Sequence, residues 1–314
     1  MREPSFETQL FAMDTYMTFS ARGERSKEAV EAAAEEVRRL EKLFSVSDPS
    51  GEVYRLNEQG GGSLSEDTAL LLKRGMKIFE STDGLFDVTV YLLMELWGFP
   101  TKEYRVPSEE ELYQTLKLTG SQKISFDGER LLLSQGQKID FGGIAKGYAS
   151  DRVMEIYHSY GIENGMVSLG GNVYAIGTNG AKEPWNIGIR NPKGGANDVI
   201  GSIRVSGKAV VTSGGYERYF EQDGHRYIHI LNPKTGLPAE GDLLSVTIVS
   251  EDGTLADAMS TAVYLMGNEK ARDYWRTHGE NFEMILITDQ EKIYVTEGIS
   301  EDFRSDKTYE TIYH

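Results

Sequence analysis

The chain has 314 residues, of which 39% are hydrophobic, and a formal net charge of −16 at pH 7. This length can bury a substantial core in one large domain or two smaller ones, and the acidic balance disfavours a nucleic-acid partner. The absence of cysteine excludes disulfides, thiolate catalysis, zinc–cysteine sites and iron–sulfur clusters. No run of residues is long and apolar enough to predict a membrane span.

The first elements follow from hydrophobic spacing. Alternation over residues 8–21 predicts a strand, and apolar residues at helical spacing predict an amphipathic helix over 26–43. Turn-prone residues fill the stretch that follows. Further helices are predicted over 65–81 and over 108–116, where a serine and a glutamate have capping-box spacing. Two short strands flank Asp127-Gly128 and predict a hairpin.

The stretch from Asp140 to Asp151 is predicted to be a strand end, a glycine turn and a helix start. Residues 138–141 alternate as a short strand does, Gly142 and Gly143 allow backbone angles closed to other residues, and helical spacing follows. Free amides at a helix start and the cation of Lys146 would suit a phosphate. A P-loop is excluded, because Tyr-Ala follows Gly147 where Lys-Ser/Thr is required. The alternative is a turn that packs a helix onto a sheet.

The second half of the chain is rich in short strands. Two are predicted around Gly170-Gly171, and a strong turn occupies residues 232–236. The mixture of local β-meanders and separate helices predicts an α+β fold with largely antiparallel sheets and flanking helices. The remaining predicted strands are 185–190, 200–205, 209–212, 216–221, 227–231, 244–249, 282–288 and 292–295, and the remaining helices are 255–266 and 268–278.

Asp257 and Thr261 form a candidate metal site. They lie four residues apart and so share one face of the predicted helix, beside the small residues Ala258 and Ala262. A carboxylate and a hydroxyl are hard oxygen donors that suit Mg²⁺, with water and phosphate completing its coordination. The same spacing also fits a polar helix face packed against a loop.

Three further features allow two interpretations each. His229, before the 232–236 turn, is either a proton acceptor or an ordinary strand histidine. The hydroxyl-rich, glycine-opened residues 212–216 form either a phosphate loop or a turn between strands. Asp87 either binds a polar ligand group or caps the helix that follows it.

Taken together and in order, the motifs of this chain resemble the ApbE family of FAD:protein FMN transferases. The resemblance spans nearly the whole chain, as a single domain over 1–314, although Asp14 stands where the family has glycine. The motifs that carry it are Ala12-Met13-Asp14-Thr15, 43–57, Gly84-Leu85-Phe86-Asp87, Leu96-Trp97-Gly98-Phe99, Asp140 to Asp151, 167–172, Thr212-Ser213-Gly214, 229–236 and 256–262.

The resemblance implies a flavin cleft between two subdomains, where Mg²⁺ binds at the pyrophosphate of FAD. A Ser or Thr hydroxyl in the flavinylation motif of a target flavoprotein attacks the FMN phosphorus, and AMP leaves. By resemblance, the carbonyl of Gly143, Asp257 and Thr261 are the Mg²⁺ ligands, and His229 is the base. The implied FAD contacts are Met13, Ser47, Leu85, Phe86, Asp87, Asp140, Lys146 and Ser245.

Two other functions stay open at this point: a Mg²⁺-dependent pyrophosphatase that splits FAD into FMN and AMP, and a non-catalytic FAD-binding protein. Many family members are exported and anchored to a lipid through a cysteine near the N-terminus. The resemblance therefore predicts an extracytoplasmic protein, membrane-anchored in its full precursor, with the export signal absent from this sequence. A cytoplasmic location is the alternative.

Overall fold

The computed structural model describes residues 3–195 and 197–314. The described chain forms two compact units, each built from segments that are distant in the sequence. Unit 1 contains the residues up to Glu41 together with Lys146–Gly214 and Asp242–His314. Unit 2 contains Lys42–Ala145 and Gly215–Gly241. The mixed α+β class with mostly antiparallel strands is confirmed.

Unit 1 is built on a nine-stranded sheet in the order β1-β2-β6-β7-β10-β13-β14-β15-β17. Neighbouring strands are antiparallel except for β15 and β17, which run parallel. The strands are β1 Ser5–Ala12, β2 Thr15–Arg22, β6 Asn164–Leu169, β7 Asn172–Ile176, β10 Lys208–Gly214, β13 Leu243–Ser250, β14 Glu283–Thr288, β15 Ile293–Thr296 and β17 Tyr309–Ile312.

The prediction of one strand over 8–21 is wrong, because the segment is a hairpin. Strands β1 and β2 pair along their whole length and are joined by Met13 and Asp14. Both turn residues have positive φ, 48° and 59°. Two-residue hairpin turns need positive φ because only that twist matches the twist of the strands. Asp14 enters the left-handed region that a family glycine would occupy, which aspartate tolerates better than most residues.

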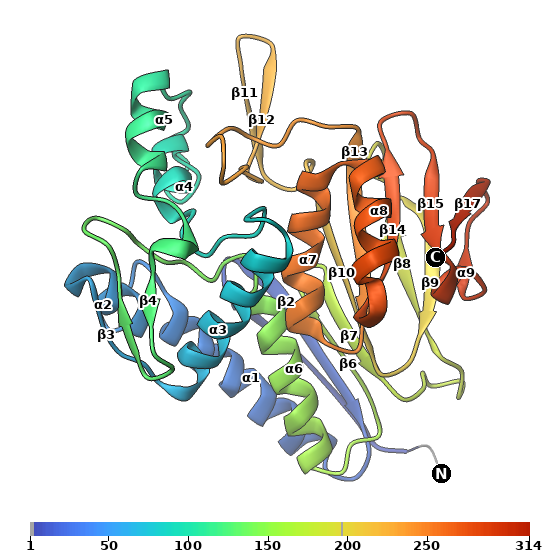
Figure 1. The fold of residues 1–314 in the computed structure, drawn as a ribbon. Helices are drawn as coiled ribbons and strands as arrows, with labels where there is room; N and C mark the ends of the chain where they lie inside the picture. The colour runs from blue at the N-terminus through green and yellow to red at the C-terminus, as the bar shows by residue number, and fades with distance from the viewer. Residues whose placement is uncertain (1–2, 196) are drawn as a thin grey trace. The chain divides into compact units, whose positions relative to one another are not determined.

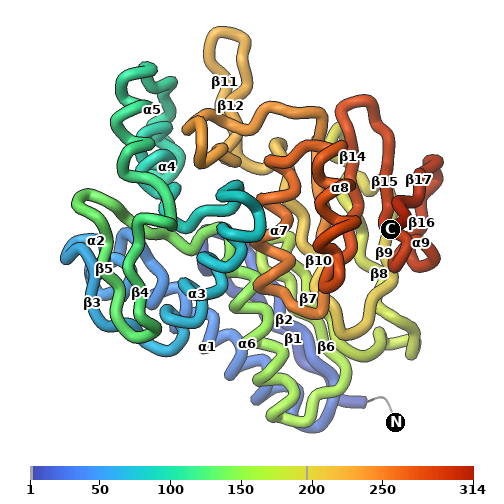
Figure 2. Tube along the Cα trace, viewed as in Figure 1, coloured from blue at the N-terminus to red at the C-terminus, as the bar shows by residue number. Residues whose placement is uncertain are grey.

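Helices cover one face of this sheet (Figures 1 and 2). Helix α7, Gly253–Met266, packs on β10 and β13, and α8, Asn268–His278, packs beside it. Helix α6, Ala145–Ser159, lies over β6, where the Tyr157 ring leaves room only for Gly165. Helix α1, Ser26–Phe44, is joined to α6 by an Arg152–Glu36 ion pair of 3.3 Å. The helices predicted over 26–43, 255–266 and 268–278 are confirmed.

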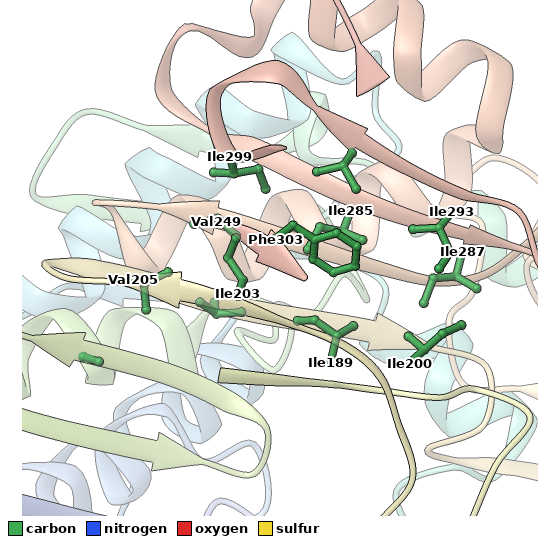
Figure 3. Close-up of a cluster of buried hydrophobic side chains, with 13 residues drawn as sticks. Ile189, Ile200, Ile203, Val205, Val249, Ile285, Ile287, Ile293, Ile299 and Phe303 are labelled. Atoms are coloured by element: carbon green, nitrogen blue, oxygen red, sulfur yellow. The ribbon is translucent and has the colours of Figure 1, made fainter. Parts of the chain in front are cut away.

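The opposite face of the sheet carries an apolar core of unit 1 (Figure 3). A three-stranded sheet of β8 Trp185–Arg190, β9 Val199–Val205 and β16 Phe303–Arg304 contributes to this core. The core is rich in β-branched residues, which pack well on pleated surfaces. Its buried members include Ile189, Ile200, Ile203, Val205, Val249, Ile285, Ile287, Ile293, Ile299 and Phe303. The short helices η2 Gly279–Asn281 and α9 Glu297–Ser300 complete unit 1.

Unit 2 contains helices, a three-stranded sheet in the order β3-β5-β4, and the β11–β12 hairpin. The capping box of Ser108 and Glu111 is present at the start of α5, and the hairpin around Asp127-Gly128 is confirmed. Its elements are α2 Glu52–Gln59, β3 Gly61–Ser63, α3 Glu66–Ser81, α4 Tyr91–Trp97, α5 Glu109–Leu116, η1 Ser121–Lys123, β4 Ser125–Phe126, β5 Arg130–Leu132, β11 Tyr219–Gln222 and β12 His225–Ile228. The sequence had predicted only turns where α2 forms.

An aromatic cluster organises the core of unit 2. Trp97 and Phe99 pack with Phe220 of the β11–β12 hairpin. The indole N–H of Trp97 donates to the carbonyl of Gly236 at 2.8 Å. This bond attaches the predicted 232–236 turn, which the structure confirms, to helix α4.

The strand predicted over 138–141 is wrong. The side-chain amide of Asn57 instead pairs with the backbone N–H and carbonyl of Ile139, both at 2.8 Å, so these groups need no sheet partner. Gly142 and Gly143 do not adopt positive φ. Glycine at 143 avoids a close contact, because a Cβ there would lie 3.2 Å from the Phe86 ring.

The turn considered over 212–216 is also wrong in part, since residues 212–214 belong to strand β10.

Candidate functional site

A hydrogen bond between a backbone amide and a buried carboxylate joins α6 to α7 in unit 1. The backbone N–H of Gly147 donates to Oδ2 of Asp257 at 2.8 Å. A Cβ at position 147 would lie 2.2 Å from the Gly253 carbonyl oxygen and 2.6 Å from the Asp257 Cβ. The two helices therefore meet backbone to backbone, and glycine at 147 is what lets the amide reach the carboxylate.

Asp257 is only 6% exposed and sits among small side chains. Ala258 and Ala262 are completely buried beside it, and Thr261 follows one helical turn later. Within the described residues, neither Asp257 Oδ1 nor the Thr261 hydroxyl has a hydrogen-bond partner. A buried carboxylate with one oxygen uncommitted, beside a hydroxyl on the same helix face, is chemically suited to a hard cation.

Asp151 fixes the start of α7, and sequence reasoning gave it no role. Its carboxylate accepts the backbone N–H groups of Gly253 at 2.7 Å and Thr254 at 2.9 Å, and the Thr254 hydroxyl. Burial raises its pKa to about 6. Accepting two orphan amides at a helix N-terminus is the function of a cap, although Asp151 comes from another helix. The sequence signal was an aspartate one turn after Gly147 on a predicted helix.

The other predicted ligand contacts of unit 1 lie on different elements. The backbone N–H of Met13, in the β1–β2 turn, donates to Oε1 of Glu41 at 2.6 Å. Lys146 is the second residue of α6 and is partly exposed. Ser245 is fully buried on β13, and its hydroxyl has no partner in the described chain. Strand alternation puts Ser245 on the side of Thr247, away from α7.

In unit 2, the predicted residues around the glycine pair and the 45–51 loop are exposed or half-buried. One carboxylate oxygen of Asp140 accepts the Gly142 N–H at 3.0 Å, which holds the loop before α6. Gly143 is exposed. Ser47 is exposed in a loop, where its backbone N–H donates to the Ser45 hydroxyl at 3.3 Å.

The side chain of Asp87 is held by hydrogen bonds within unit 2. Its carboxylate accepts from the Thr89 N–H at 2.8 Å, the Thr89 hydroxyl at 2.7 Å and the Ser121 hydroxyl at 2.6 Å. The cap position of α4 is Val90, so Asp87 stabilises the loop before that helix and does not cap it directly. The preceding Leu85 is half-buried and Phe86 is buried.

A pocket of about 570 Å³ adjoins this loop within unit 2. Asp87 and the main chain of Gly84 and Gly120 contribute to its lining, together with Asp83 and Lys234, which form an ion pair of 2.5 Å. The loop that carries three of the predicted FAD contacts thus borders a hollow that both polar and apolar groups line.

His229 follows β12 directly, and its ring is oriented by the main chain. Nδ1 lies 3.1 Å from the carbonyl oxygen of Arg218, and the His229 backbone N–H donates to the same oxygen at 3.0 Å. Because a carbonyl can only accept, the Nδ1 must carry the hydrogen, and the lone pair of the neutral ring is on Nε2. The ring is half-buried and 6.5 Å from that of Phe99. The histidine is therefore held in the tautomer that a base needs.

The predicted residues divide between the two units. Unit 1 carries Asp257, Thr261, Lys146, Met13 and Ser245, and unit 2 carries the others. No group of three or more His, Asp or Glu side chains that could hold a metal ion occurs in residues 3–195 and 197–314. No helix in these ranges is long and apolar enough to cross a bilayer.

Unit 1 thus carries a buried carboxylate on α7, and unit 2 carries a histidine whose ring is oriented by the main chain. Residues 13–286 match the ApbE family, and the chain belongs to that family. A curated relative from Klebsiella pneumoniae (strain 342), named FAD:protein FMN transferase, is 33% identical over 258 residues, which are 80% of this chain and 79% of the relative. One from Vibrio cholerae with the same name is 34% identical over 244 residues, 76% of this chain and 73% of the relative.

Solved structures agree with this assignment. The crystal structure of the ApbE protein from Thermotoga maritima has a TM-score of 0.89 and 38% sequence identity, and covers 96% of this chain and 100% of its own. The flavin transferase ApbE from Vibrio cholerae has a TM-score of 0.85 and 29% identity, and covers 95% of this chain and 100% of its own. The family resemblance inferred from the motifs is confirmed.

Proposed function

We propose that this protein transfers FMN from FAD to a Ser or Thr hydroxyl of a target flavoprotein and releases AMP, with Mg²⁺ as the metal. The observation that carries the proposal is the Gly147–Asp257 contact, which orients a buried carboxylate on α7. It adds a physical basis to the names of the relatives, which by themselves give the reaction but no residue roles.

Asp257 and Thr261 are the side chains that would hold the ion, with the carbonyl of Gly143. In a regular helix the Gly147 amide would bond the carbonyl four residues earlier, which is that of Gly143. Because Asp257 takes this amide, that carbonyl is released from the bond. Two hard oxygens and a carbonyl suit Mg²⁺, which usually keeps several waters and binds through one or two carboxylates plus phosphate. Bound there, the ion would neutralise charge on a diphosphate.

The proposed transfer forms one bond and breaks one. The acceptor hydroxyl oxygen bonds to the FMN phosphorus, the bond from that phosphorus to the bridging oxygen breaks, and AMP leaves with the bridging oxygen. His229 accepts the hydroxyl proton at Nε2, the nitrogen that the Arg218 carbonyl leaves unprotonated. Lys146 would contribute positive charge. Positioning and charge neutralisation account for most catalysis of phosphoryl-type displacements.

The test is an assay of covalent flavinylation. The protein is incubated with FAD, Mg²⁺ and a flavoprotein that carries a Ser/Thr flavinylation motif, and the acceptor is examined by mass spectrometry and in-gel flavin fluorescence. An acceptor gaining FMN, with one AMP released for each, supports the proposal. AMP released equally fast without acceptor would instead identify a pyrophosphatase, and intact FAD in every arm would identify a flavin-binding protein.

The metal assignment has its own test. Replacing Asp257 with alanine is expected to abolish turnover and to remove saturable Mg²⁺ binding, because the buried carboxylate is the charged ligand. Gly241→Ala is the matched control, since a Cβ there meets nothing within 4 Å. Native-like Mg²⁺ dependence of the Asp257→Ala protein would refute the assignment.

A further inference from the structure

One row of side chains crosses the unit 1 sheet beneath the helices and has a single polar member. Strand register aligns residues of β2, β6, β7, β10, β13 and β14 in this row. Five of the six side chains are apolar and buried, and the remaining one, on β7, is Asn172. In order, the row is Met17, Leu169, Asn172, Val211, Ile248 and Met284.

The row faces α6 and α7. Ser213, two residues after Val211 on β10, shares a hydrogen bond of 2.7 Å with the hydroxyl of Ser260 on α7. Tyr174, two residues after Asn172 on β7, donates its hydroxyl to the carbonyl of Glu251 just before α7. Since side chains two residues apart on a strand share a face, the Asn172 amide points into the layer between sheet and helices.

The amide of Asn172 has no partner there. The residue is 2% exposed, and neither its Oδ1 nor its Nδ2 has a hydrogen bond within the described chain. A buried amide without hydrogen bonds is unfavourable, and the five apolar members show that an aliphatic side chain suits this row. The preceding turn does not explain the asparagine, because Gly170 and Gly171 supply both positive φ angles. A partner from outside the chain is therefore implied.

Asp257 lies at the level of this row. Helix α7 follows β13 after two residues, so it runs antiparallel to β13 and in the same direction as β10. Val211 is two strand residues, roughly 6.6 Å, before Ser213. On α7 the same distance before Ser260 corresponds to about four residues, which reaches Ala256, the residue next to Asp257. The bond from Gly147 draws Asp257 towards α6, on the side of β10 where β7 lies.

We infer that Asn172 is a positioning residue for Asp257 and acts through ordered water buried between them. Its Nδ2 donates to the water, and the water donates to the carboxylate. Buried waters commonly satisfy such orphan polar groups, and partners of this kind orient metal-ligating carboxylates. The inference rests on the proposed function, because Asp257 must be a metal ligand for its orientation to affect the ion.

The test replaces Asn172 with leucine, which matches its row neighbours. Mg²⁺ binding is measured by isothermal titration calorimetry, and Mn²⁺ binding by electron paramagnetic resonance. The dissociation constant for either ion is expected to rise about 10–100-fold. The melting temperature should not fall, and FAD affinity in EDTA should not change. Tyr157→Phe is the matched control: it also removes a buried, unpartnered polar atom from this layer, and its metal affinity should stay native.

Unchanged metal affinity in Asn172→Leu, with the native protein binding metal and Asp257→Ala failing to, overturns the inference and leaves the proposed function intact. Absence of metal binding by the native protein overturns both. A crystal structure of the native protein with Mg²⁺ gives an answer that does not depend on a variant folding. Water within hydrogen-bond distance of both Asn172 and Asp257 supports the inference, and a dry gap between them overturns it.

Discussion

Gly147→Ala tests whether the α6–α7 contact sets both stability and metal binding. The added Cβ would lie 2.2 Å from the Gly253 carbonyl oxygen, roughly 1 Å short of ordinary van der Waals contact. The obstacle is backbone at the start of α7, so no side-chain rotation can relieve it. The helices must separate, and the Gly147–Asp257 bond must lengthen or break.

The magnitude combines two opposing effects. Overpacking of a close contact costs about 1–3 kcal/mol. The preference of helices for alanine over glycine returns about 0.5–1 kcal/mol. The difference is about 0–2.5 kcal/mol, and the backbone obstacle places the loss in the upper half of that range. For 314 residues this is a fall of about 2–4 °C in melting temperature.

Two assays follow the two consequences: thermal unfolding by circular dichroism, and Mg²⁺ titration by calorimetry. The variant should be less stable and should bind Mg²⁺ more weakly, whereas Gly241→Ala, whose added Cβ meets nothing within 4 Å, should match the native protein in both. If Gly147→Ala melts at the native temperature and binds Mg²⁺ with native affinity, the steric reasoning is refuted.

Three further predictions concern single side chains. His229→Ala should keep FAD affinity and lose about 10²–10⁴-fold in transfer rate, measured by acceptor flavinylation; a native rate would remove it as the base. Thr261→Val should raise the Mg²⁺ dissociation constant with little change in melting temperature, and an unchanged constant would remove the hydroxyl from the site. Burial raises the pKa of Asp151 to about 6, so its contribution to stability is greatest below pH 4 and is lost as pH rises through 6. We therefore expect the native protein to lose melting temperature relative to Asp151→Asn as the pH rises from 4 to 7. A difference between the two proteins that does not change with pH would contradict the raised pKa.

The sequence by itself determined most elements and the family. Apolar spacing predicted the long helices α1, α3, α7 and α8, and the capping box marked the start of α5, because these signals depend on residues only a few positions apart. The ordered motifs pointed to the ApbE family, which the comparisons confirm. Local spacing also put Asp257 and Thr261 on one helix face.

Only the tertiary structure decided which groups are paired. Nothing local shows that the Gly147 amide bonds Asp257, 110 residues away, or that Asn57 replaces a sheet partner for Ile139. The same limit explains the errors: residues 138–141 alternate as a strand does, yet a side chain from α2 satisfies the backbone of Ile139. The polarity of Asn172 is ordinary in the sequence and becomes conspicuous only when strand register sets it in an apolar row. Hydrogen bonds and packing between distant segments depend on register and helix crossing, which short-range patterns do not encode.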